Sequence, residues 1–160
     1  MFQKKPAVSL IELIITVAIV IGLVGAAAPN LSRFSKSASY HGKVSEIETM
    51  VNNISALARN PQIGQTEYRL MINNGILYVD PPPPNNKNVV MEKDQTVSSG
   101  VQSGGVILRC YVPGNTCVTG GGTTISDQYT DIVQFTDNNF ATVRTKTFGV
   151  KNNPFKVRVQ

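Results

Sequence analysis

The sequence predicts an α+β protein in which one long N-terminal helix, half of it transmembrane, packs on an antiparallel β-domain. Three observations support this fold class. The N-terminus carries a long apolar run, apolar residues then recur at spacings of three and four up to residue 60, and polar and apolar residues alternate beyond Pro61. Hydrophobic residues make up 41% of the 160 residues and charged residues only 16%, a balance that suits a membrane-tethered protein.

The apolar run extends from Val8 to Ala28 and contains a single charged residue, Glu12. As a helix it would span about 30 Å, the thickness of a bilayer core. Lys4 and Lys5 precede it, so the positive-inside rule places the N-terminus in the cytoplasm and the remainder outside. A secretory signal peptide and a plain signal anchor are alternatives, but neither explains an ionisable group within the span.

The stretch PAVSLIELIITVAIVIGLVGAAAP resembles the class III signal of type IV prepilins and type II secretion pseudopilins. The shared features are the basic leader and the Ser-Leu-Ile-Glu run that ends at Glu12. The resemblance implies that a prepilin peptidase cuts between Ala7 and Val8 and that the new amino group of Val8 is methylated. The chain departs from the family's usual pattern at the cut, where Gly commonly precedes and Phe follows.

In that family the glutamate neutralises the N-terminal amine of an adjacent subunit, so the resemblance implies that Glu12 is an assembly contact. Gly22 and Pro29 match positions that bracket a section of helix able to unwind in assembled pili; a simple kink is the alternative. The implied partners are other pilin or pseudopilin subunits, the prepilin peptidase and an inner-membrane assembly platform. The implied location is the bacterial inner membrane, followed by a pilus or pseudopilus.

The expected organisation has four parts: a basic leader (1–7), a transmembrane or filament-core helix (8–30), an amphipathic helix packed on the domain (31–60) and an extracytoplasmic antiparallel β-domain (61–160). The amphipathic part ends near Asn60-Pro61, because the residue before a proline disfavours helix. Its apolar face is expected to comprise Tyr40, Val44, Ile47, Val51, Ile54 and Ala58.

The first hairpin of the β-domain is expected over residues 67–80, EYRLMINNGILYVD. Asn74-Gly75 favours a type I′ turn, which sets a register that pairs Arg69 with Asp80 as a cross-strand ion pair. The run of prolines that follows indicates a stiff extended connection.

A second hairpin is expected over residues 131–148, with Val133 and Phe135 opposite Ala141 and Val143. The C-terminal segment PFKVRVQ then closes the sheet as a strand whose phenylalanine and valines point inward.

Cys110 and Cys117 flank a Pro-Gly turn signal, so the turn can bring the two side chains within disulfide reach. A disulfide is expected if the domain lies outside the cytoplasm; two reduced thiols are the alternative. His41 stands alone, and no cluster has the spacing of a metal site, so the sequence indicates neither an enzyme nor a cofactor.

The last 23 residues contain no acid but several cations. A basic stripe for DNA phosphates would use Arg144, Lys146, Lys156 and Arg158. A solvated outer face is the simpler reading and is favoured over DNA binding.

The order of helix, early hairpin, irregular middle and late hairpin resembles H-type minor pseudopilins and related minor pilins. The expected function is therefore that of a structural subunit of a type IV pilus or type II secretion pseudopilus. A DNA-binding minor pilin for natural transformation, a major pilin and a plain membrane-anchored β-domain are the alternatives.

Overall fold

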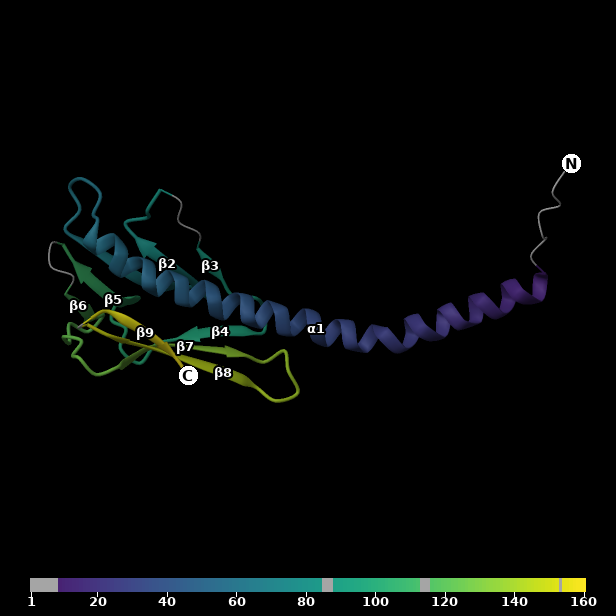
Figure 1. Ribbon diagram of the computed structural model, residues 1–160. Coiled ribbons are helices and arrows are strands. Elements are labelled where there is room, and N and C mark those ends of the chain that lie inside the picture. Colours follow the sequence, from purple (N-terminus) through teal and green to yellow (C-terminus); the bar gives the residue numbers. More distant parts are fainter. Residues whose placement is uncertain (1–8, 85–87, 113–115, 153) are drawn as a thin grey trace, which may run out of the picture. The chain divides into compact units, whose positions relative to one another are not determined.

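A computed structural model describes residues 9–84, 88–112, 116–152 and 154–160, and of residues 27–29 the backbone alone. Within these ranges the chain forms one helix, α1 (Leu10–Arg59), and antiparallel strands that follow it, which confirms the α+β layout (Figure 1). The strands are β1 (Glu67–Asn73), β2 (Ile76–Asp80), β3 (Val89–Val90), β4 (Gln95–Ser98), β5 (Val106–Tyr111), β6 (Cys117–Thr119), β7 (Thr130–Asp137), β8 (Arg144–Lys151) and β9 (Lys156–Val159).

The chain divides into two compact units, Met1–Ser39 and Tyr40–Gln160. The helix α1 contributes to both units, and all nine described strands belong to the second.

The strands of the second unit form two antiparallel sheets. The five-stranded sheet has the order β3-β2-β1-β5-β6, and the four-stranded sheet has the order β4-β7-β8-β9. Residues of α1 from Tyr40 onward form one hydrophobic core with residues of both sheets. Figure 1 shows this part of the helix lying along the strands.

The amphipathic face predicted for α1 is confirmed. Ile47, Val51 and Ile54 are fully buried, and Tyr40 and Ala58 nearly so. A spacing of three or four residues keeps these side chains on one side of the helix, where they meet the sheets. The large fully buried side chains of the strands that complete this core include Tyr68, Leu70, Leu77, Ile107, Leu108, Phe135 and Phe148.

The first hairpin has the predicted register. Arg69 pairs with Asp80. Asn74 and Gly75 form the turn with positive φ angles of 48° and 74°, the left-handed conformation that a type I′ turn requires and that Asn-Gly supplies. The guanidinium of Arg69 lies 3.8 Å from the Asp80 carboxylate, as expected, and it also contacts Glu67.

The second hairpin exists, but the predicted register is wrong. Phe135 pairs with Lys146 and Val133 with Phe148, so neither faces Ala141 or Val143. The connection is longer than expected because the Asp137 side chain accepts a hydrogen bond from the backbone N–H of Asn139 (2.8 Å) and from Gln95 (2.9 Å). These bonds hold the chain in a loop between Asp137 and Arg144, so Ala141 and Val143 lie in the loop and not in the second strand.

The C-terminal strand β9 pairs with β8 at the edge of the four-stranded sheet, as predicted. Phe155, Val157 and Val159 are partly buried and pack against the core. The valines therefore face inward, and Lys156 and Arg158 face the other side of the sheet.

Candidate functional site

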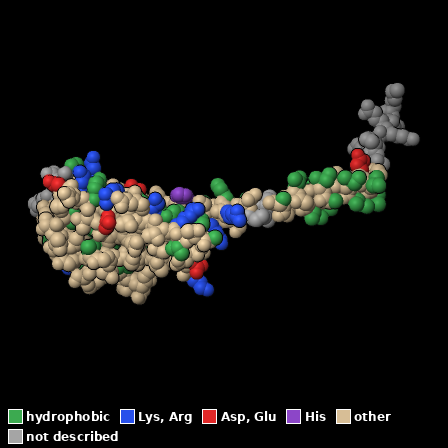
Figure 2. Space-filling view, turned by 90° about the horizontal axis from the view of Figure 1, so that it is seen from below, with side chains coloured by type: hydrophobic (Ala, Val, Ile, Leu, Met, Phe, Trp, Pro, Cys, Tyr) green, Lys and Arg blue, Asp and Glu red, His purple; other side chains and the backbone are tan. Residues whose placement is uncertain are grey.

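The N-terminal part of α1 is one candidate site because its described apolar side chains are exposed. It is a helix long and apolar enough to cross a membrane, and the apolar window is exposed throughout. Figure 2 shows hydrophobic side chains gathered along this part of the helix. Large exposed apolar surfaces on a protein mark contact with a membrane or another protein. The exposed large side chains include Leu10, Ile11, Leu13, Ile14, Ile15, Val17, Ile19, Val20, Ile21, Leu23 and Val24.

Glu12 lies in the first turn of α1. A carboxylate at this end of a helix is favoured by the helix dipole, whose positive end lies there. The hydroxyl of Thr16 donates to the carbonyl oxygens of Glu12 and Leu13 (3.0 and 2.8 Å), so it does not engage the Glu12 side chain. Among the described residues the carboxylate of Glu12 makes no ion pair.

The predicted cleavage site, Ala7 and Val8, lies outside the described residues. Gly22 and Pro29 both lie within α1, which is helical throughout its length. A Cβ atom at Gly22 would meet nothing within 4 Å, so no packing contact explains the glycine. The expected unwinding of this section concerns an assembled filament and stays a prediction.

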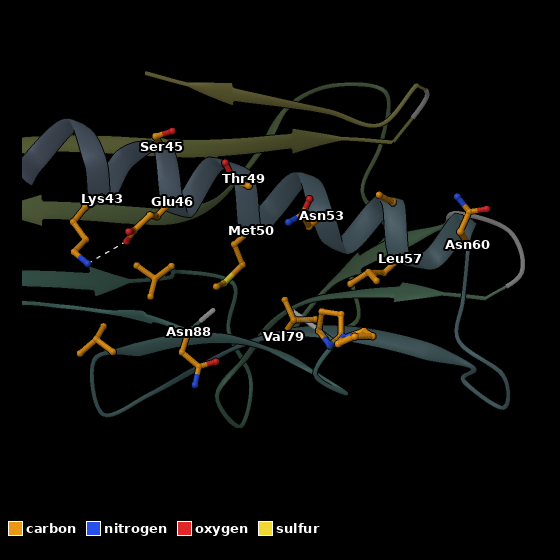
Figure 3. Close-up of a pocket in the computed structure, with 15 residues that line it drawn as sticks. Lys43, Ser45, Glu46, Thr49, Met50, Asn53, Leu57, Asn60, Val79 and Asn88 are labelled. Atoms are coloured by element: carbon orange, nitrogen blue, oxygen red, sulfur yellow. Dashed lines mark hydrogen bonds and ion pairs between the residues drawn. The ribbon is translucent and has the colours of Figure 1, made fainter. Parts of the chain in front are cut away.

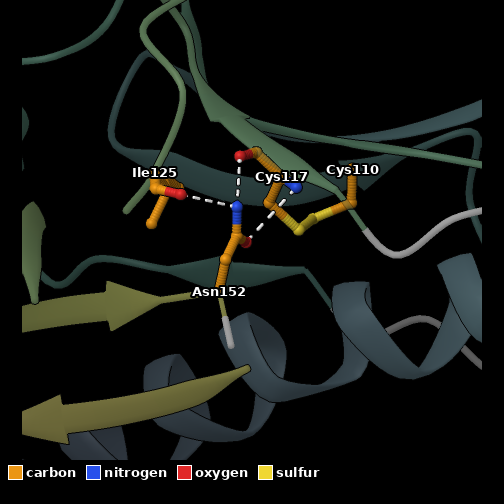
Figure 4. Close-up of a disulfide and its surroundings, with 4 residues drawn as sticks. All are labelled: Cys110, Cys117, Ile125 and Asn152. Carbon is orange, nitrogen blue, oxygen red and sulfur yellow. Dashed lines mark hydrogen bonds between the residues drawn. A yellow bond between two sulfur atoms is a disulfide. The ribbon is translucent and has the colours of Figure 1, made fainter. Parts of the chain in front are cut away.

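The disulfide between Cys110 and Cys117 is present and links β5 to β6, where the two residues are directly paired. Asn152, which follows β8, reaches this corner from the other sheet (Figure 4). Its amide nitrogen donates to the carbonyls of Cys117 (3.0 Å) and Ile125 (2.7 Å), and its oxygen accepts from the N–H of Cys117 (3.3 Å). The disulfide therefore attaches β6 to β5, and Asn152 attaches it to the end of β8 in the other sheet.

The four cations of the predicted basic stripe do not lie together. On β8, Arg144 and Lys146 share a face with the buried Phe148, since the three alternate regularly along the strand. Arg158 pairs with Gly149, which is on the opposite face, and Lys156 shares that face. The register thus divides the stripe into two pairs on opposite sides of the sheet.

Two of these cations also have partners within the chain. The Arg144 guanidinium lies 3.8 Å from the ring centroid of Phe140 and 5.6 Å from that of Tyr40. The Arg158 guanidinium lies 3.4 Å from a carboxylate oxygen of Asp131 and 4.7 Å from the ring centroid of Tyr129. Both side chains are occupied by cation–π or charge contacts that stabilise the domain.

Burial raises the pKa of the Tyr40 hydroxyl above its usual value. The positive charge of Arg144 opposes this increase, and the carboxylate of Asp137 adds to it. The tyrosine is therefore kept neutral where α1 meets the four-stranded sheet. Its neighbour His41 is exposed and contacts the Tyr40 ring edge-on, with centroids 5.4 Å apart.

A groove of about 850 Å³ lies between α1 and the edge of the five-stranded sheet (Figure 3). Met50 and Leu57 border it from the helix, and Val79, Val89 and Val90 border it from β2 and β3. No local sequence pattern indicates this groove. Its far wall depends on the two-residue strand β3, for which the sequence offers only a short apolar pair in a polar stretch.

Searches against protein-family models, curated proteins and solved structures return no match to this chain.

Proposed function

We propose that the chain is a minor pilin or pseudopilin, a structural subunit of a type IV pilus or type II secretion pseudopilus. In this proposal the apolar half of α1 lies in the inner membrane before assembly and in the core of a helical filament afterwards. The β-domain lies outside the membrane and makes the specific contacts. The resemblance of the N-terminal segment to prepilin signals suggested the proposal.

The observation that carries the proposal is the combination of an exposed apolar segment in the N-terminal part of α1 with one carboxylate near its start. The apolar surface alone is explained by a lipid bilayer, so a plain anchor would meet that requirement equally well. A carboxylate within the apolar segment is costly unless a cation reaches it. A new amino terminus on a neighbouring copy, created by cleavage after Ala7, would supply that cation.

The second unit supports separate roles for the apolar segment and the β-domain because its hydrophobic core does not include the apolar segment. Every buried hydrophobic residue of the described structure lies at or beyond Tyr40. The disulfide Cys110–Cys117 fits a domain that lies outside the reducing cytoplasm. A domain of this kind can be carried on the outside of a filament while its N-terminal helix changes surroundings from lipid to protein.

The DNA-binding alternative loses its main support. A stripe of four phosphate-binding cations needs all of them on one face, but β8 and β9 place Arg144 and Lys146 opposite Lys156 and Arg158. A major pilin remains the main alternative within the same family, because it would use the same N-terminal helix.

The test is the substitution Glu12→Gln in cells that carry the assembly machinery. The amide has the shape of the carboxylate but no charge, so it cannot neutralise a neighbouring amino terminus. We expect the amount of filament recovered by shearing and pelleting to fall at least about tenfold, since losing a buried ionic partner costs more than about 1.4 kcal/mol. Glu48→Gln, the same change farther along α1, is the matched control and should assemble as the parent chain does.

N-terminal sequencing of the membrane fraction distinguishes assembly from processing. Both variants and the parent chain should begin at Val8. Unchanged filament yield with Glu12→Gln would overturn the assembly role of this carboxylate, and a parent chain that still begins at Met1 would favour a plain membrane anchor.

A further inference from the structure

The face of the five-stranded sheet that points away from the core carries a row of charged side chains. Pairing between strands places Asp80, Arg69 and Arg109 side by side on β2, β1 and β5. Leu70, the next residue along β1, is fully buried. Because successive side chains of a strand point to opposite faces, the charged row faces outward.

The first arginine of this row is neutralised within the chain. The guanidinium of Arg69 contacts the carboxylate of Glu67 and lies 3.8 Å from that of Asp80. Both acids that share the face are thereby turned toward Arg69. Two arginines directly opposite each other on neighbouring strands repel, so these acids relieve only part of the unfavourable charge.

The second arginine has no such partner. Among the described residues the side chain of Arg109 makes no hydrogen bond and no ion pair, and its Nε is inaccessible to solvent and has no acceptor. An arginine has five N–H donors and cannot lose its charge at neutral pH. Burying one N–H group of a charged guanidinium without an acceptor is unfavourable, and an acceptor from outside the chain would remove this cost.

The surroundings of Arg109 indicate the kind of acceptor. Tyr111, 41% exposed, lies on the same face and is paired with Glu67; Val118 pairs with Arg109 on its other side. An aromatic ring and an aliphatic side chain beside an arginine are typical of the centre of a protein interface. Glu67 and Asp80 on the same face would repel the closely spaced phosphates of a nucleic acid.

We propose that this surface, defined by Glu67, Arg69, Asp80, Arg109 and Tyr111 and here named the Arg109 face, docks an acidic segment of a second protein. One carboxylate of that segment accepts hydrogen bonds from the Arg109 guanidinium, and apolar neighbours of the carboxylate cover Tyr111. The inference concerns the β-domain alone and does not depend on filament assembly.

A different protein fits this surface better than a second copy of the chain. The chain carries 15 basic and 10 acidic residues, a net charge of +5, so it offers fewer acids than cations for the Arg109 face of a second copy. Several of its acids are also already engaged. They are Glu46 with Lys43, Glu67 and Asp80 with Arg69, Asp131 with Arg158, and the buried Asp137 with Gln95.

The first experiment measures thermal unfolding of the full chain in detergent with Arg109→Met, which keeps the length of the side chain and removes its charge. We expect Tm to rise by about 2–4 °C, because an uncompensated charge is replaced by an apolar group. Lys156→Met, a cation-to-methionine change at an exposed position of β9, should leave Tm unchanged. A fall in Tm with Arg109→Met would mean that the guanidinium has an acceptor within the chain, and the proposal would be overturned.

The second experiment places a photoreactive amino acid at position 111 in cells and maps the cross-linked peptide by mass spectrometry. We expect a peptide of a different protein with an aspartate or glutamate near the cross-link. The yield should fall at least about tenfold with Arg109→Met and persist with Lys156→Met. Arg109→Glu should also abolish the cross-link, and the opposite change of the mapped acid to arginine should restore it.

Each other outcome counts against the proposal. A cross-link to a second copy of the chain, to nucleic acid or to lipid would assign the face to another occupant. The arginine would be excluded from the interface by any of three results. These are a cross-link whose yield is unchanged by Arg109→Met, a charge exchange that does not restore the cross-link, and no cross-link at all.

Discussion

Tyr40 lies where α1 meets the four-stranded sheet, and its environment couples stability to pH. Its ring stacks on Phe135 (5.7 Å between centroids) and meets Phe140 edge-on (5.8 Å). Burial, the largest influence, raises the pKa of the hydroxyl above its usual value of about 10. The folded chain therefore binds the phenolic proton more tightly than the unfolded chain does.

The resulting prediction concerns alkaline pH. Stabilisation from a raised pKa is fully present below pH 10 and is lost as pH rises from there through the folded-state pKa. Above pH 10 we expect the parent chain to lose up to about 1.4 kcal/mol of unfolding free energy per pH unit more than Tyr40→Phe does. Denaturant unfolding of both chains from pH 8 to pH 11 measures this difference.

The control lies within the same series of measurements. Between pH 8 and pH 9 the difference in stability between the two chains should stay constant, because the hydroxyl is protonated in both folded and unfolded states. A difference that stays constant up to pH 11 as well would contradict a raised pKa at Tyr40.

Single residues were predictable from sequence where the signal is local. The disulfide was predictable because Cys110 and Cys117 flank a turn. Glu12 is identified as the one charge in an apolar run, and its assembly role stays a prediction. Arg109 gives no such signal, because its lack of an acceptor follows from the positions of Glu67 and Asp80 on neighbouring strands. Only the register between the strands shows that Glu67 and Asp80 both form ion pairs with Arg69.

At the scale of elements, Asn152 joins the two sheets by binding the backbone of Cys117 and Ile125 (Figure 4). We expect Asn152→Ala to lower the free energy of unfolding by about 2–3 kcal/mol, since three hydrogen bonds are lost at backbone groups that are only partly accessible. Urea unfolding of the oxidised chain measures this loss.

Asn138→Ala is the matched control for this prediction. Asn138 is exposed, and within the described part of the chain only its backbone forms a hydrogen bond, to Asp94. Its substitution should change stability by less than about 0.5 kcal/mol. Equal effects of the two substitutions would mean that the side chain of Asn152 does not hold β6 in place.

The two hairpins show what local sequence can determine about an element. Asn74-Gly75 fixes the first register because this pair adopts a two-residue turn without help from the rest of the chain. The second hairpin has no glycine in its turn, and its loop is set by contacts with distant residues, Asp137 with Gln95 and Phe140 with Tyr40. The register also divides the cations considered for DNA binding, since alternation within one strand does not give the register between strands.

On the scale of the whole molecule, the division into Met1–Ser39 and Tyr40–Gln160 follows from where apolar side chains are buried. The large apolar residues of α1 before Tyr40 are exposed, whereas those of the second unit form one core. The two units therefore have different solvent requirements, although one helix runs through both. The predicted division of the helix into a transmembrane or filament-core part (8–30) and an amphipathic part (31–60) concerns a membrane or a filament and stays a prediction.

We expect a chain that lacks residues 1–34 to be soluble and monomeric without detergent and to unfold in one cooperative transition. This chain begins at Ser35, and serine is a favoured residue for the start of a helix. It retains every buried hydrophobic residue of the described structure.

A chain that lacks residues 1–47 is the control, because it also loses the buried Tyr40 and Ile47. Each of these side chains contributes about 1.5–3 kcal/mol through burial, so the shorter chain should unfold at a much lower urea concentration. Light scattering and urea unfolding distinguish the two chains. Aggregation of the longer chain, or stability equal to that of the shorter one, would show that the core of the β-domain does not begin at Tyr40.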